Sequence, residues 1–204
     1  MKAETLKNIF YFLEGKYGAR TPWLWRYMNN MPLTKEDLIV NVNFELNNSK
    51  LTSLPEGLDF KNTFFIKECI NLTSLPKGLK VGKDLALIDC PNLMYLPEGL
   101  KVGREFLLRK CPSLKSLPEG LKVGTDLKLS DCTSLTSLPK GLKVDYLSLA
   151  NCPMLTSLPE GLQVKYDLYI RNMPLERLSD SDLLKMIGPN GYIKRKNSEN
   201  KYLK

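Results

Sequence analysis

Five cysteines are the side chains of this sequence best suited to chemistry, and they are evenly spaced: Cys69, Cys90, Cys111, Cys132 and Cys152. A cysteine nucleophile needs a nearby base, but the sequence contains no histidine. A linear row of sulfurs is also a poor tetrahedral zinc site. We interpret the row as a buried ladder of small side chains. We therefore expect no catalytic residue, no metal and no cofactor.

The cysteine spacing follows a tandem repeat. KVGKDLALIDCPNLMYLPEGL at 80–100 is followed by KVGREFLLRKCPSLKSLPEGL at 101–121 and KVGTDLKLSDCTSLTSLPKGL at 122–142. Similar units occupy 59–79 and 143–162, the latter one residue shorter. Self-similarity at a short fixed period is typical of a solenoid.

Each unit contains a short alternating segment such as Leu85-Ala86-Leu87, which predicts a strand with one buried face. A strand this short cannot bury its apolar side alone, so we expect it to stack on its counterparts in the adjacent units. In the following turn, Pro97 fixes φ and Gly99 admits a conformation closed to other residues. Leu93, Leu96, Leu100 and Val102 would then fill the interior.

This pattern resembles the leucine-rich repeat family over roughly residues 38–178. The strand-and-cysteine pattern is similar to the cysteine-containing class, and the recurring Leu-Pro pairs and SLPEGLKVG units resemble short bacterial and bacteriophage arrays. The pairs lie at 54–55, 75–76, 96–97, 117–118, 138–139 and 158–159. The resemblance implies an α/β solenoid with one curved parallel β-sheet, an N-terminal helical cap and a short C-terminal helix. It also implies a bacterial or phage factor that inhibits or scaffolds a host protein.

We divide the chain into three parts. Residues 1–37 form an N-terminal cap, with an amphipathic helix over 2–17 followed by aromatic side chains; the alternative is an aromatic docking surface. Residues 38–178 are the solenoid, with degenerate first and last units. Residues 179–204 begin with N-cap candidates from Ser179 to Asp182, continue as a short helix and end in a basic tail from Asn190.

The hydropathy and the cysteine content of the sequence bear on where in the cell the protein is located. The sequence has no apolar run of about 18 residues and no signal-peptide pattern, so we expect neither a membrane span nor a membrane partner. Five cysteines leave one unpaired in any disulfide scheme, and parallel inward side chains disfavour bridges. We therefore expect a reducing, cytoplasmic location, which would be the host cytoplasm for an injected or phage-encoded factor.

The outward face of the predicted sheet varies from unit to unit. Its candidate partner-binding residues are Phe65, Lys67, Ala86, Ile88, Leu107, Arg109, Lys128, Tyr169 and Arg171. We expect Phe65, Ile88 and Leu107 to form an exposed apolar cluster flanked by Lys67, Arg109 and Lys128. Apolar anchors with arginine nearby are typical of protein interfaces. The main hypothesis is therefore a non-enzymatic module that binds a partner protein on its concave sheet face.

A second hypothesis is nucleic-acid binding. The net charge is +8, and one lysine recurs at the same place in successive units: Lys80, Lys101, Lys122 and Lys143. Such a stripe, with the basic tail, could follow a phosphate backbone. The alternative is a solvated edge, because Glu98 and Glu119 precede two of these lysines by three residues.

Overall fold

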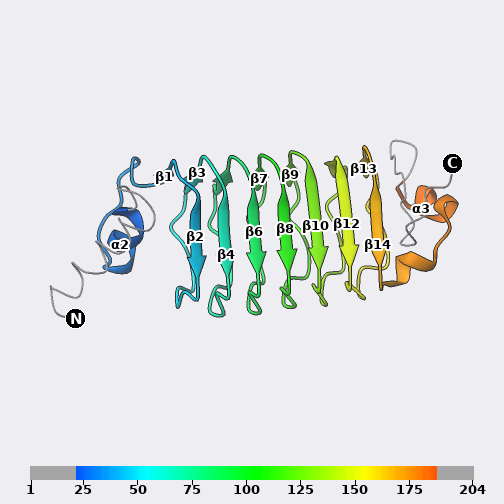
Figure 1. The fold of residues 1–204 in the computed structure, drawn as a ribbon, viewed down its shortest axis with the longest axis horizontal. Coiled ribbons are helices and arrows are strands. Elements are labelled where there is room, and N and C mark those ends of the chain that lie inside the picture. The colour runs from blue at the N-terminus through cyan, green and yellow to red at the C-terminus, as the bar shows by residue number, and fades with distance from the viewer. Residues whose placement is uncertain (1–21, 188–204) are drawn as a thin grey trace.

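The chain forms a solenoid of parallel β-strands with few helices, with turns of about 21 residues (Figure 1). A computed structural model describes residues 22–187. The helix expected over 2–17 and the basic tail from Asn190 lie outside these residues. Within the described region, no helix has the length and apolar character needed to cross a membrane.

Each coil contributes one longer strand to a seven-stranded sheet and one two-residue strand to a second set. The longer strands are β2 (Phe44–Asn47), β4 (Phe64–Lys67), β6 (Leu85–Ile88), β8 (Phe106–Arg109), β10 (Asp126–Ser130), β12 (Tyr146–Ala150) and β14 (Leu168–Arg171). The short strands are β1 (Ile39–Val40), β3 (Asp59–Phe60), β5 (Lys80–Val81), β7 (Lys101–Val102), β9 (Lys122–Val123), β11 (Lys143–Val144) and β13 (Gln163–Val164). The helices are α2 (Pro22–Met28), the 3-10 helix η1 (Pro174–Arg177) and α3 (Asp180–Ile187).

The structure contains more sheets than the single one expected from the sequence. The longer strands form one sheet in chain order, but the short strands form a five-stranded sheet, β1-β3-β5-β7-β9, and a separate pair, β11-β13. The interruption falls between β9 and β11, at the start of the 143–162 unit, and the residue that this unit lacks comes after β11. Unit length alone does not explain the break, because β1 pairs with β3, and β11 with β13, across the shorter spacing.

The core is the predicted leucine stack. Leu87, Leu108 and Leu129 are register partners on adjacent strands and are buried. Leu93, Leu96, Leu100 and Val102 are buried as well, and all five cysteines are fully buried and free. Each coil thus shelters the apolar face of its neighbours, as the repeat requires.

The repeat pattern does not reveal the backbone conformation of the residue before each cysteine. The residue just before each cysteine has a positive φ, close to 55°, although none of these residues is glycine: Glu68, Asp89, Lys110, Asp131 and Asn151. This left-handed residue turns the chain at the carboxyl end of each longer strand. The cysteine thiol then donates a hydrogen bond to the carbonyl two residues earlier, for example from Cys90 Sγ to Ile88 O at 3.5 Å.

Both ends of the described stack carry packed side chains. At the first coil, Trp23 of α2 is fully buried, with its ring centroid 5.4 Å from that of Phe44. At the last coil, Ser179 accepts a hydrogen bond at Oγ from the Asp182 N–H, which fits an N-cap. The carbonyl of Ile187 at the end of α3 accepts a bond from the Gly161 N–H at 2.7 Å.

Candidate functional site

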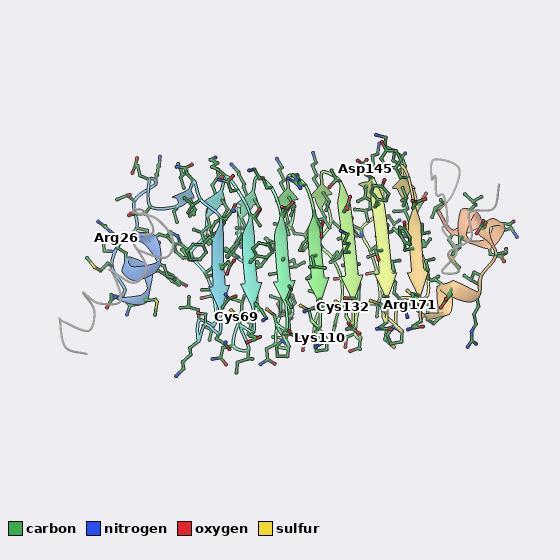
Figure 2. The ribbon with its side chains drawn as sticks, in the orientation of Figure 1. Arg26, Cys69, Lys110, Cys132, Asp145 and Arg171 are labelled. Atoms are coloured by element: carbon green, nitrogen blue, oxygen red, sulfur yellow. The ribbon has the colours of Figure 1, made fainter. Side chains whose placement is uncertain are left out.

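The outward face of the seven-stranded sheet presents two columns of side chains in register. Phe65, Ala86, Leu107 and Lys128 follow one another across β4, β6, β8 and β10, while Lys67, Ile88 and Arg109 form the parallel column. Tyr169 and Arg171 extend the same columns on β14. In Figure 2, Arg171 lies at the carboxyl end of that strand. The structure therefore brings the predicted residues onto one face.

The apolar cluster is less exposed than the sequence suggested. Phe65 is 38% exposed, and Ile88 and Leu107 are half-buried, but Ala86 is only 3% exposed. Ala86 points outward, but its short side chain lies between Phe65 and Leu107 on the adjacent strands, about 4.8 Å away on either side. Ala86 therefore supports the two larger side chains and offers little surface of its own.

Ion pairs neutralise two of the basic residues predicted beside the apolar cluster, Lys67 and Lys128. Lys128 Nζ lies 2.8 Å from Glu105 Oε2 and 3.5 Å from Asp126 Oδ2, and Lys67 Nζ lies 3.0 Å from Glu68 Oε1. The hydrogen bond to Glu105 raises the pKa of Lys128. Both of these flanking lysines are therefore already paired with acids of the same chain. Across residues 22–187, Arg109 and Arg171 form no ion pair, so they are the cations that this face offers to a partner.

The partners of Lys128 belong to a row of recurring acids. Asp84, Glu105 and Asp126 precede or begin successive longer strands. Asp84 Oδ1 lies 3.4 Å from Arg104 Nε, and its other oxygen accepts a bond from the Thr63 hydroxyl. The recurrence of acids one period apart was the available signal, but the partners of Glu105 and Asp84, which are Lys128 and Arg104, lie in the next coil.

The cysteine thiols behave as buried structural groups. Burial raises the pKa of Cys69, and the hydrogen bond shared with the Cys90 sulfur, together with burial, raises the pKa of Cys111. The same causes, with Cys152 as the neighbour, raise the pKa of Cys132. The bonds to Cys111 and Cys132 lower the pKa of Cys90 and Cys152 in turn, but all five sulfurs are fully buried, which shields the reactive thiolate form from solvent. Among the described residues, no cluster of three or more potential metal ligands occurs.

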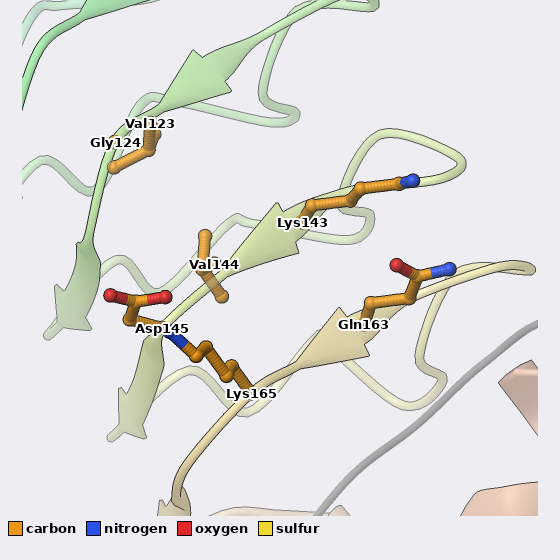
Figure 3. A pocket seen from close by; sticks show the side chains of 7 residues that line it. All are labelled: Val123, Gly124, Lys143, Val144, Asp145, Gln163 and Lys165. Atoms are coloured by element: carbon orange, nitrogen blue, oxygen red, sulfur yellow. The ribbon is translucent and has the colours of Figure 1, made fainter.

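The lysine stripe lies on the short-strand side. Lys80, Lys101 and Lys122 are register partners on β5, β7 and β9, Lys143 follows on β11, and all are exposed. Beside them lie two open hollows of about 470 and 490 Å³, which adjoin at Val123 and Gly124 and which we together call the groove. Figure 3 shows its far end, where Asp145 and Lys165 point toward one another while Lys143 and Gln163 extend the other way.

An aromatic pair beside this groove was missed by sequence reasoning. Tyr146 and Tyr166 are both exposed, and their ring centroids are 5.1 Å apart. Lys165 Nζ lies 4.7 Å from the Tyr166 centroid, and a hydrogen bond to Tyr166 raises the pKa of this lysine. The two tyrosines are 20 positions apart in the shortened part of the array. The missing residue was the signal that this corner differs from the others.

No family model, curated protein or solved structure matched the chain. The proposals below therefore depend on the geometry of its surfaces.

Proposed function

We propose that the protein is a non-enzymatic leucine-rich repeat module that binds a partner protein through the outward face of its seven-stranded sheet. The observation that carries this proposal is the clustering of Phe65, Ile88 and Leu107 on the three adjacent strands β4, β6 and β8. We call these three residues the apolar patch. Apolar side chains gathered at the middle of a surface mark interaction sites more often than scattered ones do.

Charge around the apolar patch indicates the partner's chemistry. Arg109 is the register neighbour of Ile88, is exposed, and has no ion pair in the described region. Arginine is enriched at the energetic centres of interfaces because its planar fork binds carboxylates at two points. We expect a partner that places an apolar side chain over Phe65 and Leu107 and a carboxylate near Arg109.

The repeat explains how such a surface could be specific. Inward positions must stay leucine-like for the coils to stack, whereas outward positions are free to differ from coil to coil. The column from Phe65 through Ala86 and Leu107 to Lys128 changes in size and charge at every step. A partner lying across the strands would therefore meet a different side chain about every 4.8 Å.

The test is a triple substitution, Phe65→Asp, Ile88→Asp and Leu107→Asp, used as bait beside the wild-type protein in cells that produce it. Partners that the wild type captures would be purified, and their direct binding measured by calorimetry. Charges at the centre of an interface should weaken direct binding roughly 100-fold or more.

A matched control places the same charges elsewhere. Ile70 and Met154 are exposed apolar residues outside the strands, so Ile70→Asp with Met154→Asp should leave binding within about twofold. Circular dichroism of every variant checks that the solenoid is intact. Equal binding by the triple variant and the wild type would rule out the sheet face as the binding site.

A further inference from the structure

The lysine row on the short-strand side has no counter-charge of its own. Lys80, Lys101, Lys122 and Lys143 are exposed, and none of them forms an ion pair with another residue of the 22–187 segment. Glu98 and Glu119 do not pair with them, and Glu160 Oε2 lies 3.5 Å from Lys140 Nζ instead. Register pairing stacks three of these lysines on adjacent strands, about 4.8 Å apart. Like charges this close repel one another, and a bound polyanion would relieve that repulsion.

The groove beside the row gives an extended ligand a path along the solenoid. Its walls include Gly82, Gly103 and Gly124, which follow the buried valines of the short strands. These glycines present bare backbone, because a Cβ atom at any of them would collide with the preceding coil. The groove passes from the coil of β3 to that of β13, since its two parts share Val123 and Gly124.

Each carboxylate in the groove lies near a lysine. Asp59 Oδ2 accepts a hydrogen bond from Lys61 Nζ at 2.6 Å. Asp145 faces Lys165, whose side chain points toward it (Figure 3). The groove therefore keeps a positive balance along the lysine row, and its two acids lie at the ends of the row.

Aromatic rings mark one end of the groove. Tyr146 and Tyr166 are 37% and 42% exposed, and Lys165, which lines the groove, lies over the Tyr166 ring. Tyr146 takes the place that Asp84, Glu105 and Asp126 hold in the three preceding coils. Asp167 holds this place again in the next coil, so Tyr146 interrupts the acidic row at this end of the groove. Exposed aromatic rings beside a cationic track are what unpaired bases stack on.

We propose that this groove binds single-stranded nucleic acid, with the phosphate backbone along the row from Lys80 to Lys143 and a base stacked on the Tyr146–Tyr166 pair. The row supplies affinity through release of counterions from the strand. The tyrosine pair supplies a preference for unpaired bases, which a stacked duplex does not offer. This surface is separate from the apolar patch, so the two proposals stand or fall independently.

The test uses a fluorescein-labelled 20-nucleotide oligo(dT) strand, with binding followed by fluorescence anisotropy at 50 mM and 200 mM NaCl. One variant carries Lys80→Gln, Lys101→Gln, Lys122→Gln and Lys143→Gln. Its control loses the same number of charges away from the groove, through Lys50→Gln, Lys110→Gln, Lys115→Gln and Lys185→Gln, all at exposed positions. The groove variant should bind at least tenfold more weakly at 50 mM NaCl and show a shallower salt dependence, while the control stays within about threefold.

A second variant, Tyr146→Ala with Tyr166→Ala, tests the stacking. It should lose about fivefold or more in affinity for oligo(dT) and keep the wild-type affinity for inorganic polyphosphate, which has no bases. Equal affinity of the wild type and the tyrosine variant for oligo(dT) would overturn the proposal in favour of unspecific anion binding. If the groove variant and its control lost oligo(dT) affinity equally, the lysine row would not be the binding site. Tighter binding of a duplex of the same length would overturn the preference for single strands.

Discussion

A Cβ atom on Gly103 would lie 2.0 Å from the carbonyl oxygen of Gly82 in the preceding coil. The same contact recurs one coil later, where a Cβ on Gly124 would lie 1.9 Å from Gly103 O. Both glycines donate their N–H to the preceding coil, from Gly103 to Val81 O at 2.8 Å and from Gly124 to Val102 O at 3.0 Å. Glycine is needed here for the close approach of two backbones, and any side chain would push the coils apart.

Gly103→Ala should therefore destabilise the protein strongly, by about 3 kcal/mol, because backbone atoms cannot move aside as a side-chain tip can. The matched control is Gly99→Ala. Gly99 has a φ of 66° but nothing within 4 Å of an added Cβ, so its cost should be the conformational one alone, about 1 kcal/mol. Urea unfolding followed by circular dichroism measures both. An equal loss at the two positions would contradict the close-approach explanation.

Lys110→Asn should stabilise the protein. Lys110 has a φ of 54°, a conformation that asparagine tolerates better than lysine and that Asn48, Asn151 and Asn172 adopt in other coils. The substitution removes an exposed ion pair with Asp89 at 3.5 Å, which contributes little. We expect a gain of about 0.5 kcal/mol in the free energy of unfolding. Lys110→Ala removes the same ion pair without improving the backbone fit, so it should be less stable than Lys110→Asn.

Cys111 and Cys132 should make the protein lose stability at alkaline pH. The pKa of Cys111 and Cys132 is raised in the folded state, so their contribution is fully present below the unfolded thiol pKa of about 8.5. As pH rises beyond that value the unfolded state loses protons that the folded state keeps, and stability falls. Between pH 9 and 10 each such thiol adds a slope of up to about 1.4 kcal/mol per pH unit.

Unfolding free energies measured from pH 7 to 10 test this slope, with Cys111→Ala as the comparison. The variant should be less stable at pH 7, because it leaves a cavity, but its loss between pH 9 and 10 should be smaller than that of the wild type. A thiol reagent should also find all five cysteines unreactive until the chain is unfolded. Rapid labelling of the native protein would contradict the buried ladder.

Two neighbouring leucines test the register of the large sheet. Leu108 is fully buried in the core, while Leu107 lies half-buried on the outward face. Leu108→Ala should cost about 3 kcal/mol, and Leu107→Ala less than about 1 kcal/mol. Thermal and urea unfolding of both variants measure the difference. A larger cost at Leu107 would mean that the strand faces the other way.

Much of the fold could be predicted from the repeat, because a period-two pattern inside a fixed-length unit determines which side chains point inward. The stacking of Leu87 on Leu108, the burial of the cysteines and the helix after Ser179 all follow from such local patterns. The second ladder, formed by the short strands, could not be predicted in this way, because two-residue strands leave no periodic pattern of their own.

The surfaces were less predictable. Alternation assigned Ala86 to the outward face, but only the size of Phe65 and Leu107 on neighbouring strands determines that it is buried. Alternation also placed Lys128 beside the apolar cluster, but only the coil packing determines that Glu105 Oε2 lies 2.8 Å from its Nζ. The left-handed residue before each cysteine went unnoticed for a similar reason, since neither Glu68 nor Lys110 is a type that favours that conformation by itself.

The amino-acid sequence by itself determined the repeat length, the inward leucines, the buried sulfurs and the lysine that recurs in successive units. Only the tertiary structure decided which charges are paired, which glycines are needed for backbone contact, and that Tyr146 and Tyr166 meet beside the groove. The physical reason is that inward or outward direction is a property of one strand, whereas contacts on the surface join residues a full coil apart. Such contacts exist only once the coils are stacked.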